Sequence, residues 1–311
     1  MEKTTKPYDL IIAGAGPAGM AAGIYAARLN LKTLLIAKSI GGQISSKAVA
    51  IENYPGFEKI QGPELLKKME AHLKSFGIEI KTGEVLEIKK KQNFIVLTKE
   101  KEYQACSVIV ATGAKPKELN IPREKEFLGK GVSYCSVCDG PIFRNKTVAV
   151  IGGGNAGFET ASFLTNIAKK IYILEYSDQI KAFPYIQKTV LASKNTQVIL
   201  QAQVMEIKGN KLVNSLVYED RSSNKEKILN VQGVFVEAGY VASAPKTSLA
   251  DFNKSGEIIV EFETMQTKTP GLFAAGDVNA GQFKQIVAAA GEGAKAALAA
   301  HNFIKRKKIE K

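Results

Sequence analysis

Tyr8-Asp-Leu-Ile-Ile-Ala-Gly-Ala-Gly-Pro-Ala-Gly19 is an apolar strand that runs directly into a glycine-rich turn. Small residues over positions 20–29 predict a helix, and a second apolar strand follows at 32–37. In this arrangement the glycines let the backbone and the helix N-terminus approach a pyrophosphate closely. The glycines that serve this purpose are Gly14, Gly16 and Gly19. The stretch therefore predicts an α/β domain that binds a dinucleotide.

The same pattern recurs in the middle of the chain. A strand over 146–151 leads into Gly152-Gly-Gly-Asn-Ala-Gly157, followed by a helix over 158–167 and a strand over 170–174. The candidate binding residues of this turn are Gly152, Gly154, Asn155 and Gly157. Two such units predict two bound dinucleotides and two doubly wound, Rossmann-like α/β domains with added antiparallel strands.

The two copies differ where their second strands end. The second copy ends on Glu175, and a carboxylate at that position accepts hydrogen bonds from ribose hydroxyls. The first copy has Ala37-Lys38 there, so its adenosine ribose has no assigned contact. A nucleotide without a 2′-phosphate is therefore expected at the second turn.

A Cys-x-x-Cys pair, Cys135-Ser-Val-Cys138, stands just before the second turn. Such a pair closes into a disulfide with little strain, and a helix start beside it favours the thiolate that attacks other disulfides. The alternatives are half of a zinc site or a structural disulfide. Zinc normally takes four ligands, and the rest of the chain offers only Cys106 and two histidines. Cys106 itself is expected to be a buried strand residue.

The composition describes a globular protein, with 45% apolar and 23% charged residues over 311 positions. The net charge of +13 is spread along the chain without a nucleic-acid-binding module, so nucleic acid is not an expected partner. The positive charge instead favours an acidic protein partner or solubility. No apolar run is long enough to span a membrane. Three cysteines and no export signal predict a cytoplasmic protein.

A third motif lies near the C-terminus. Thr269-Pro-Gly-Leu-Phe-Ala-Ala-Gly-Asp277 is a short strand ending on an aspartate, and a helix is expected over 285–304. With two glycine turns and Cys-x-x-Cys-Asp-Gly in this order, nearly the whole chain resembles the low-molecular-weight thioredoxin reductases. The resemblance implies a flavoprotein that passes electrons from NAD(P)H through FAD and the dithiol to the disulfide of thioredoxin or a thioredoxin- or glutaredoxin-like protein. It also implies a homodimer.

The resemblance implies that FAD binds the first domain at its glycine turn and at further positions. Those positions are Gly41, Gly42, Gln43, Asn53, Ala111, Thr112, Gly113, Gly276, Asp277, Lys284, Gln285 and Ile286. For Asp277, a helix N-cap is the alternative role, and both roles are compatible. Within the dithiol, Cys138 is expected to face the flavin and Cys135 to attack the substrate disulfide. Asp139 is expected to be the acid and base for the pair, with a turn-forming aspartate as the alternative.

Departures from the family pattern bear on the nucleotide. NADPH-dependent members carry three arginines where this chain has Tyr176, Ser177 and Lys181. Glu175 and Gly157 resemble instead the flavoprotein subunit of alkyl hydroperoxide reductase, an NADH enzyme. NADH is therefore expected to be preferred over NADPH. That relative carries an N-terminal redox domain without a counterpart here, so a separate thioredoxin-like protein is expected to take the electrons.

The motifs also predict how the domains are arranged. Residues 1–116 and 246–311 are expected to form the FAD domain, and 117–245 the NAD(P)H domain with the dithiol. The crossings are expected at 115–130 and 239–245, with Gly113 and Gly239 as hinges for a domain rotation.

Three other functions remain open. They are a peroxiredoxin-system reductase acting through a separate redox domain, a ferredoxin- or flavin-linked thioredoxin reductase, and a non-enzymatic flavin-binding protein. The intact second glycine turn counts against the ferredoxin-linked enzyme. Adjacent Cys135, Cys138 and Asp139 count against a binding protein, which has no need of them.

Overall fold

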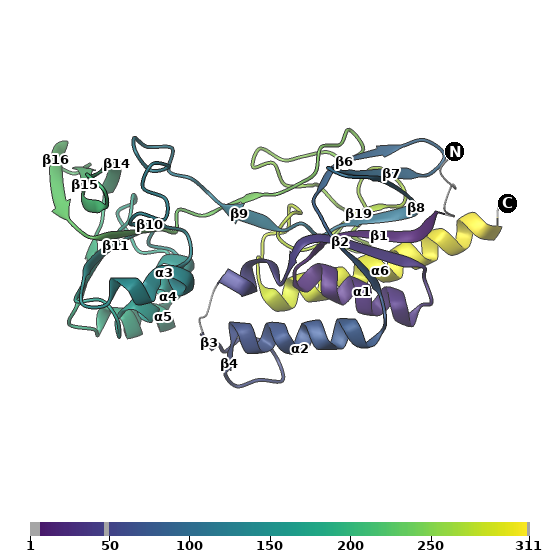
Figure 1. The fold of residues 1–311 in the computed structure, drawn as a ribbon, viewed down its shortest axis with the longest axis horizontal. Helices are drawn as coiled ribbons and strands as arrows, with labels where there is room; N and C mark the ends of the chain where they lie inside the picture. Colours follow the sequence, from purple (N-terminus) through teal and green to yellow (C-terminus); the bar gives the residue numbers. More distant parts are fainter. Residues whose placement is uncertain (1–6, 47–49, 310–311) are drawn as a thin grey trace. The chain divides into compact units, whose positions relative to one another are not determined.

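The structure is a computed structural model that describes residues 7–46 and 50–309. The chain forms two compact units (Figure 1). The first unit ends at Lys115 and resumes at Val241, and the second is Pro116–Tyr240. The second unit is thus an insertion in the first.

A seven-stranded sheet forms the centre of the first unit, in the order β5-β2-β1-β8-β7-β6, with β19 also paired to β8. Its parallel strands are β1 (Tyr8–Ala15), β2 (Thr33–Ile40), β5 (Glu79–Thr82), β8 (Glu102–Val110) and β19 (Leu272–Ala274). The antiparallel strands are β6 (Val85–Lys90) and β7 (Phe94–Thr98). Because β1 is buried on both faces, it is apolar throughout positions 10–13, as is typical of a central parallel strand.

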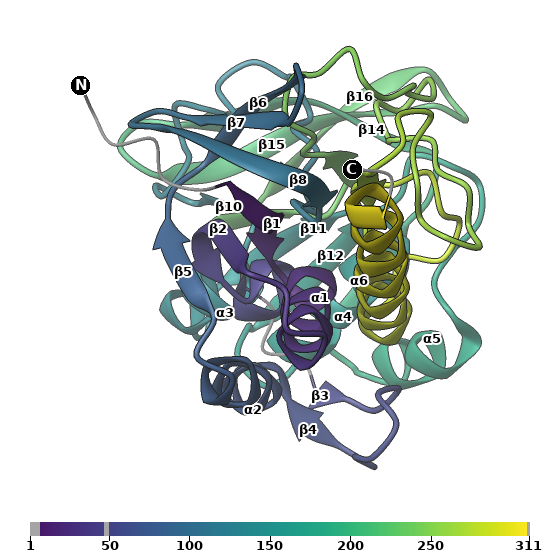
Figure 2. The ribbon, with the colours of Figure 1, turned by 90° about the vertical axis from the view of Figure 1, so that its right-hand side faces the viewer.

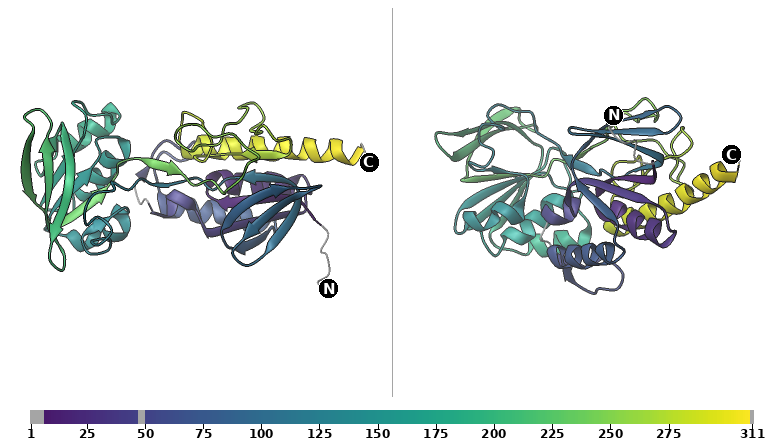
Figure 3. Two further views of the ribbon diagram at one scale, coloured as in Figure 1. Left: turned by 90° about the horizontal axis from the view of Figure 1, so that it is seen from above. Right: turned by 45° about the vertical axis from the view of Figure 1, so that its right-hand side comes forward.

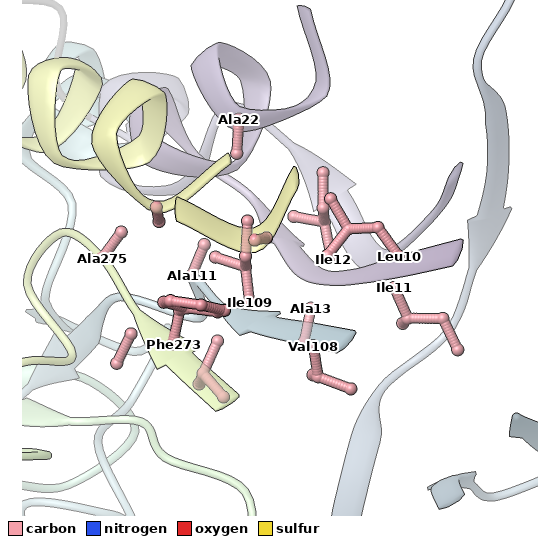
Figure 4. Close-up of a cluster of buried hydrophobic side chains, with 14 of the residues drawn as sticks. Leu10, Ile11, Ile12, Ala13, Ala22, Val108, Ile109, Ala111, Phe273 and Ala275 are labelled. Atoms are coloured by element: carbon pink, nitrogen blue, oxygen red, sulfur yellow. The ribbon is translucent and has the colours of Figure 1, made fainter. Parts of the chain in front are cut away.

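Three helices complete this unit: α1 (Pro17–Arg28), α2 (Gly62–Ser75) and α6 (Ile286–Ile309). Helices α1 and α6 lie side by side (Figure 2). Their approach depends on Gly293, where an added Cβ would lie 2.0 Å from the carbonyl oxygen of Ala18. Small residues on both helices therefore allow close packing against β1 and β8, and their side chains meet those of Ile12, Ile109 and Phe273 in the core (Figure 4).

The second unit has a parallel sheet in the order β10-β17-β11-β12-β13. The strands are β10 (Val132–Ser133), β11 (Thr147–Ile151), β12 (Lys170–Leu174), β13 (Thr196–Ile199) and β17 (Gly233–Val236). The helices of this unit are α3 (Ser136–Asp139), α4 (Asn155–Leu164) and α5 (Pro184–Leu191). Val148 and Val150 point to the face covered by α4 and α5, whereas Ala149 and Ile151 point to the other face.

That other face is covered by a separate antiparallel sheet (Figure 3). Its strands are β14 (Ala202–Gly209), β15 (Val213–Asp220) and β16 (Lys225–Asn230). Ile207 and Leu216 are fully buried against the parallel sheet. The α/β fold class with added antiparallel strands is confirmed in both units.

The chain passes between the units on two short strands that pair with each other, β9 (Ala114–Pro116) and β18 (Tyr240–Ala242). The expected crossing over 115–130 was too long, because Phe127 is fully buried in the core of the second unit. The lysines and Pro122 around it suggested a linker, but a single buried aromatic anchors the segment. Cys106 was also misjudged: it is a strand residue of β8, but it is only half-buried.

The remaining short elements are η1 (Gly42–Ser46), β3 (Ala50–Ile51), β4 (Ile60–Gln61) and η2 (Gly140–Phe143). The predicted helices and strands of both glycine-turn motifs are present, with ends shifted by a few residues. Among the described helices, none is long and apolar enough to cross a membrane.

Candidate functional site

In the first glycine turn, the fold itself requires glycine at two of the three motif positions, Gly14 and Gly19, but not at Gly16. A Cβ on Gly19 would lie 1.9 Å from the carbonyl oxygen of Gly14, and a Cβ on Gly14 would lie 2.2 Å from that of Ala111. At Gly16 a Cβ would meet nothing within 4 Å, and its φ of −75° suits any residue. The missing side chain at Gly16 therefore leaves open space above the N-terminus of α1, as an approaching pyrophosphate requires.

The N-terminus of α1 has no side-chain cap and can therefore bind an anionic ligand. Gly16 is its N-cap, no side chain caps it, and its first turn has no acidic residue. The orphan N–H groups and the positive end of the helix dipole therefore face the open space. Gly42 lies close by, since a Cβ there would be 3.4 Å from the Cα of Gly16.

Thr112 follows β8 at the same edge of the sheet. Its Oγ1 is buried and has no hydrogen-bond partner within residues 7–46 and 50–309. A buried hydroxyl without a partner is costly, so this atom suits a polar group of a bound ligand. The N–H of its neighbour Ala111 donates to Ala13 O at 2.7 Å, and Gly113 has a φ of +66°. Together with the open N-terminus of α1, these residues fit a dinucleotide such as FAD.

Asp277 lies in the loop after β19. Gln43 donates its side-chain amide to Asp277 Oδ2 at 2.8 Å, so two predicted binding residues from distant parts of the sequence meet. The loop is shaped by Glu292 of α6, whose Oε2 accepts the Gly276 N–H and the Asn279 amide, both at 2.7 Å. The sequence motifs assigned no role to Glu292, because its partners lie in a loop 13 to 16 residues earlier.

The start of α6 brings further predicted residues together. Asn53 donates its amide to Gln285 Oε1 at 3.0 Å. Lys284 donates to the carbonyl of Asn279 and pairs with Glu257 at 2.9 Å. Although burial raises the pKa of Glu257, hydrogen bonds from Asn253 and Lys284 outweigh it and leave the pKa lowered.

Two other predicted residues lie at the edges of this region. Ile286, the first residue of α6, packs against a small cluster formed by Ile51, Ile60 and Leu65. Gly41 has a φ of +111°, and a Cβ there would meet Leu66. The predicted FAD residues at 41–43, 111–113 and 276–277 therefore follow β2, β8 and β19 at one edge of the sheet.

The second glycine turn repeats the geometry of the first. A Cβ on Gly157 would lie 1.9 Å from the carbonyl oxygen of Gly152, whereas a Cβ on Gly154 would meet nothing within 4 Å. Gly154 is the N-cap of α4, and no side chain caps this helix. Asn155, predicted to contact the ligand, also has a structural role. Its Oδ1 accepts the Phe183 N–H at 2.7 Å and fixes the start of α5.

Glu175 directly follows β12 and is buried, with 7% of its surface exposed. Its Oε2 accepts the Gly153 N–H at 2.6 Å, and its Oε1 accepts the N–H and the hydroxyl of Ser177 at 2.9 and 2.6 Å. Burial raises its pKa, but these hydrogen bonds and Lys181 outweigh burial and lower it. A carboxylate has about four lone-pair sites, so about one remains for a ribose hydroxyl. The expected hydrogen bonds from ribose hydroxyls to Glu175 stay a prediction.

A hollow of about 440 Å³ lies next to Glu175. It is lined by Tyr176, Ser177, Asp178, Lys181, Gln201 and Arg221. Arg221 comes from the turn between β15 and β16, far from the glycine motif in sequence, and no spacing rule pointed to it. Its guanidinium lies 3.9 Å from the centroid of the Tyr176 ring.

Cys135 and Cys138 form a disulfide, with their Cα atoms 5.4 Å apart. Cys135 is the N-cap of α3, and its sulfur accepts the Cys138 N–H at 3.2 Å. Ser133 fixes the chain just before it, since its hydroxyl accepts the Cys135 N–H at 3.0 Å and contacts the Cys135 carbonyl at 3.1 Å. Cys135 is half-buried and Cys138 is exposed. Asp139 follows directly, and its N–H donates to Cys135 O at 3.2 Å.

The dithiol helix is connected to the second nucleotide turn. Ser136, between the two cysteines, lies 3.2 Å from Thr160 of α4, whose hydroxyl also contacts Glu237 Oε1 at 2.7 Å. The carbonyl oxygen of Glu237 is in turn the group nearest to a Cβ on Gly152. Within the described part of the chain, no three His, Cys, Asp or Glu side chains gather as metal ligands do.

Two glycine turns of the dinucleotide-binding kind and a Cys-x-x-Cys disulfide define a class of oxidoreductases, which transfer electrons between a nucleotide cofactor and a disulfide. A family model described as pyridine nucleotide-disulphide oxidoreductase matches residues 8–293. The chain belongs to this family, and membership implies FAD and a pyridine nucleotide.

Similar proteins agree with this assignment. Thioredoxin reductase of Bacillus subtilis (strain 168) is 39% identical over 302 residues, which are 96% of this chain and 95% of that protein. A component of the alkyl hydroperoxide reductase of Pseudomonas putida is 39% identical over 96% of this chain, but the chain spans only 58% of its length. The crystal structure of Lactococcus lactis thioredoxin reductase has a TM-score of 0.93 and 39% identity, covering 96% of this chain and 99% of that one. Both resemblances drawn from the motifs are confirmed.

Proposed function

We propose that the protein is an FAD-dependent thioredoxin-disulfide reductase that prefers NADH as electron donor. The observation that carries this proposal is the Cys135–Cys138 disulfide, tied through Ser136 and Thr160 to the helix of the second nucleotide turn. A structural disulfide has no need of a nucleotide turn beside it. The 95% coverage of a thioredoxin reductase supports thioredoxin, or a thioredoxin-like protein, as the substrate.

Each unit has its own binding role in this proposal. The first unit, Met1–Lys115 with Val241–Lys311, holds FAD at the N-terminus of α1 and at the loop carrying Asp277. The second unit, Pro116–Tyr240, holds the nicotinamide nucleotide at the N-terminus of α4. FAD supplies two-electron transfer between the nicotinamide and the dithiol. A homodimer is part of the proposal on the family resemblance alone.

The residues around the dithiol perform the exchange with the substrate protein. As a thiolate, Cys135 is stabilised by the Cys138 N–H, which already points at its sulfur. This thiolate attacks one sulfur of the substrate disulfide, and the other substrate sulfur leaves as a thiolate. Cys138 then attacks Cys135, which restores their disulfide and releases the second substrate sulfur. Asp139 exchanges the protons of these thiols.

The experiment that tests this function is NADH-dependent reduction of thioredoxin by purified protein. We expect Cys135→Ser and Cys138→Ser each to lower this rate by at least about a hundredfold, because both sulfurs are needed for exchange. NADH should still bleach the flavin in both variants. Cys106→Ser is the matched control and should keep the wild-type rate. Near wild-type rates in the two dithiol variants contradict the proposed roles.

The preference for NADH rests on Glu175. Its remaining lone pair can accept a ribose hydroxyl, whereas a 2′-phosphate meets its negative charge. A difference of about 1 to 3 kcal/mol gives about fivefold to more than a hundredfold selectivity. In a variant with Glu175→Ala, Tyr176→Arg and Ser177→Arg, the ratio of kcat/KM values should shift toward NADPH. A wild type that already favours NADPH, or a variant without this shift, excludes Glu175 as the cause.

A further inference from the structure

We propose that Arg221 is a binding residue of the nucleotide site and that its guanidinium, stacked on Tyr176, is the platform for the adenine ring. The inference rests on the proposed function, because it assigns the adenosine half of the nucleotide to the hollow beside Glu175. No glycine-turn pattern includes this residue. It reaches the site on the turn of the added antiparallel sheet.

The position of the hollow identifies its ligand. Glu175 and Tyr176 follow β12, the strand after the glycine turn, where dinucleotide-binding domains hold the adenosine ribose. Tyr176 and Ser177, the residues directly after Glu175, line the hollow together with Arg221. The adenosine half of the nucleotide is the part that reaches this end.

Backbone hydrogen bonds fix the turn that carries Arg221 to the end of β12. The Arg221 N–H donates to Gln201 O at 2.8 Å, and the Gln201 N–H donates to Ser177 O at 2.9 Å. Asp220 shapes the turn by accepting the Ser222 N–H at 3.0 Å and the Lys227 ammonium at 2.6 Å. The turn is therefore held in register with the nucleotide strand.

The guanidinium itself is also fixed in orientation. It lies 3.9 Å from the Tyr176 ring centroid, and Nη1 donates to Tyr176 O at 3.1 Å. A planar guanidinium on an aromatic ring presents a second flat face, on which a purine can stack. A lysine keeps the charge but has no such face.

The charges around the hollow favour adenine over a phosphate as the partner of Arg221. The two cations, Arg221 and Lys181, are matched by two carboxylates, Glu175 and Asp178. The hollow is therefore close to neutral, which suits a neutral ring and offers little excess attraction to a 2′-phosphate.

The test is calorimetric binding of ADP-ribose and of adenosine 2′,5′-bisphosphate to the holoenzyme and to the variants Arg221→Ala, Arg221→Lys and Lys225→Ala. We expect Arg221→Ala to weaken the binding of ADP-ribose about threefold to thirtyfold, and the binding of adenosine 2′,5′-bisphosphate by the same factor. Arg221→Lys should resemble the alanine variant. Lys225→Ala, on the same hairpin, should bind like wild type.

Two results overturn the inference. One is unchanged ADP-ribose binding in Arg221→Ala. The other is a loss confined to the 2′-phosphorylated nucleotide and rescued by Arg221→Lys, which makes Arg221 a phosphate ligand. Flavin reduction by reduced nicotinamide mononucleotide, which lacks adenosine, should be equal in wild type and Arg221→Ala. If NADH fails to reduce the wild-type flavin at all, the proposed function fails separately from this inference.

Discussion

Glu175 is a buried carboxylate, and Gly153 and Ser177 donate three hydrogen bonds to it. Its place after a strand predicted a ribose-binding carboxylate, because that position follows from strand and turn lengths. Its burial and its three internal hydrogen bonds could not be predicted, since Gly153 and Ser177 reach it through local backbone geometry. Arg221 was missed altogether, because it belongs to a hairpin whose packing no local pattern encodes.

The lowered pKa of Glu175 makes part of the stability depend on pH. Because the folded-state pKa lies below the ordinary value of 4.5, its contribution is present above pH 4.5 and is lost as the pH falls through the folded-state pKa. We expect Glu175→Gln to lower the free energy of unfolding by about 1 kcal/mol at pH 7. The glutamine amide replaces one accepting oxygen with an NH₂ group, which cannot accept the hydrogen bonds that Gly153 or Ser177 donates.

Urea unfolding of wild type and Glu175→Gln at a series of pH values measures this effect. The difference in unfolding free energy should shrink as the pH falls below 4.5. A difference that stays constant or grows in acid indicates that the ionised carboxylate does not stabilise the fold.

At the scale of the element, the two glycine-turn units were predictable because strand, turn and helix lie next to each other in sequence. Their ends shifted by a few residues: the first helix was expected from position 20 but starts at Pro17, since proline is well suited to the first turn of a helix. The first crossing was predicted too long because the lysines over 115–130 indicated an exposed linker, whereas Phe127 in this segment is fully buried. Long-range packing of that kind is absent from local patterns.

The glycines of the first turn give a prediction at this scale. Gly16→Ala should leave the melting temperature of the flavin-free protein within about 2 °C of wild type, because the new Cβ meets nothing. It should weaken FAD binding by about tenfold or more, since the methyl group occupies the ligand's space. Gly19→Ala should destabilise the protein by about 2 kcal/mol or more, because its Cβ meets the Gly14 carbonyl.

Thermal unfolding and fluorescence titration with FAD separate the two effects. Gly154→Ala and Gly157→Ala form the matching pair in the second turn, with ADP-ribose as the ligand. If Gly16→Ala binds FAD as tightly as wild type, the open space above α1 is not a ligand site.

At the scale of the whole molecule, the order of motifs along the chain predicted one domain inserted in another. Each unit folds around its own parallel sheet, and the two passages pair as β9 and β18. Gly113 and Gly239 flank this pairing with φ values of +66° and +103°, and a Cβ at either would meet nothing within 4 Å. They remain predicted hinges. Since the dithiol and the second glycine turn belong to the same unit, a change in the relation between the units is expected during turnover.

The central claim is that electrons from NADH are stored in two places, the flavin and the Cys135–Cys138 pair. Anaerobic titration of the flavin-loaded protein with NADH, followed by flavin absorbance and thiol counting, tests it most directly. The wild type should take up about two equivalents of NADH per chain, because FAD and one disulfide each accept two electrons. Cys138→Ser should take up about one. A wild type that is saturated by one equivalent and gains no thiols would contradict the account.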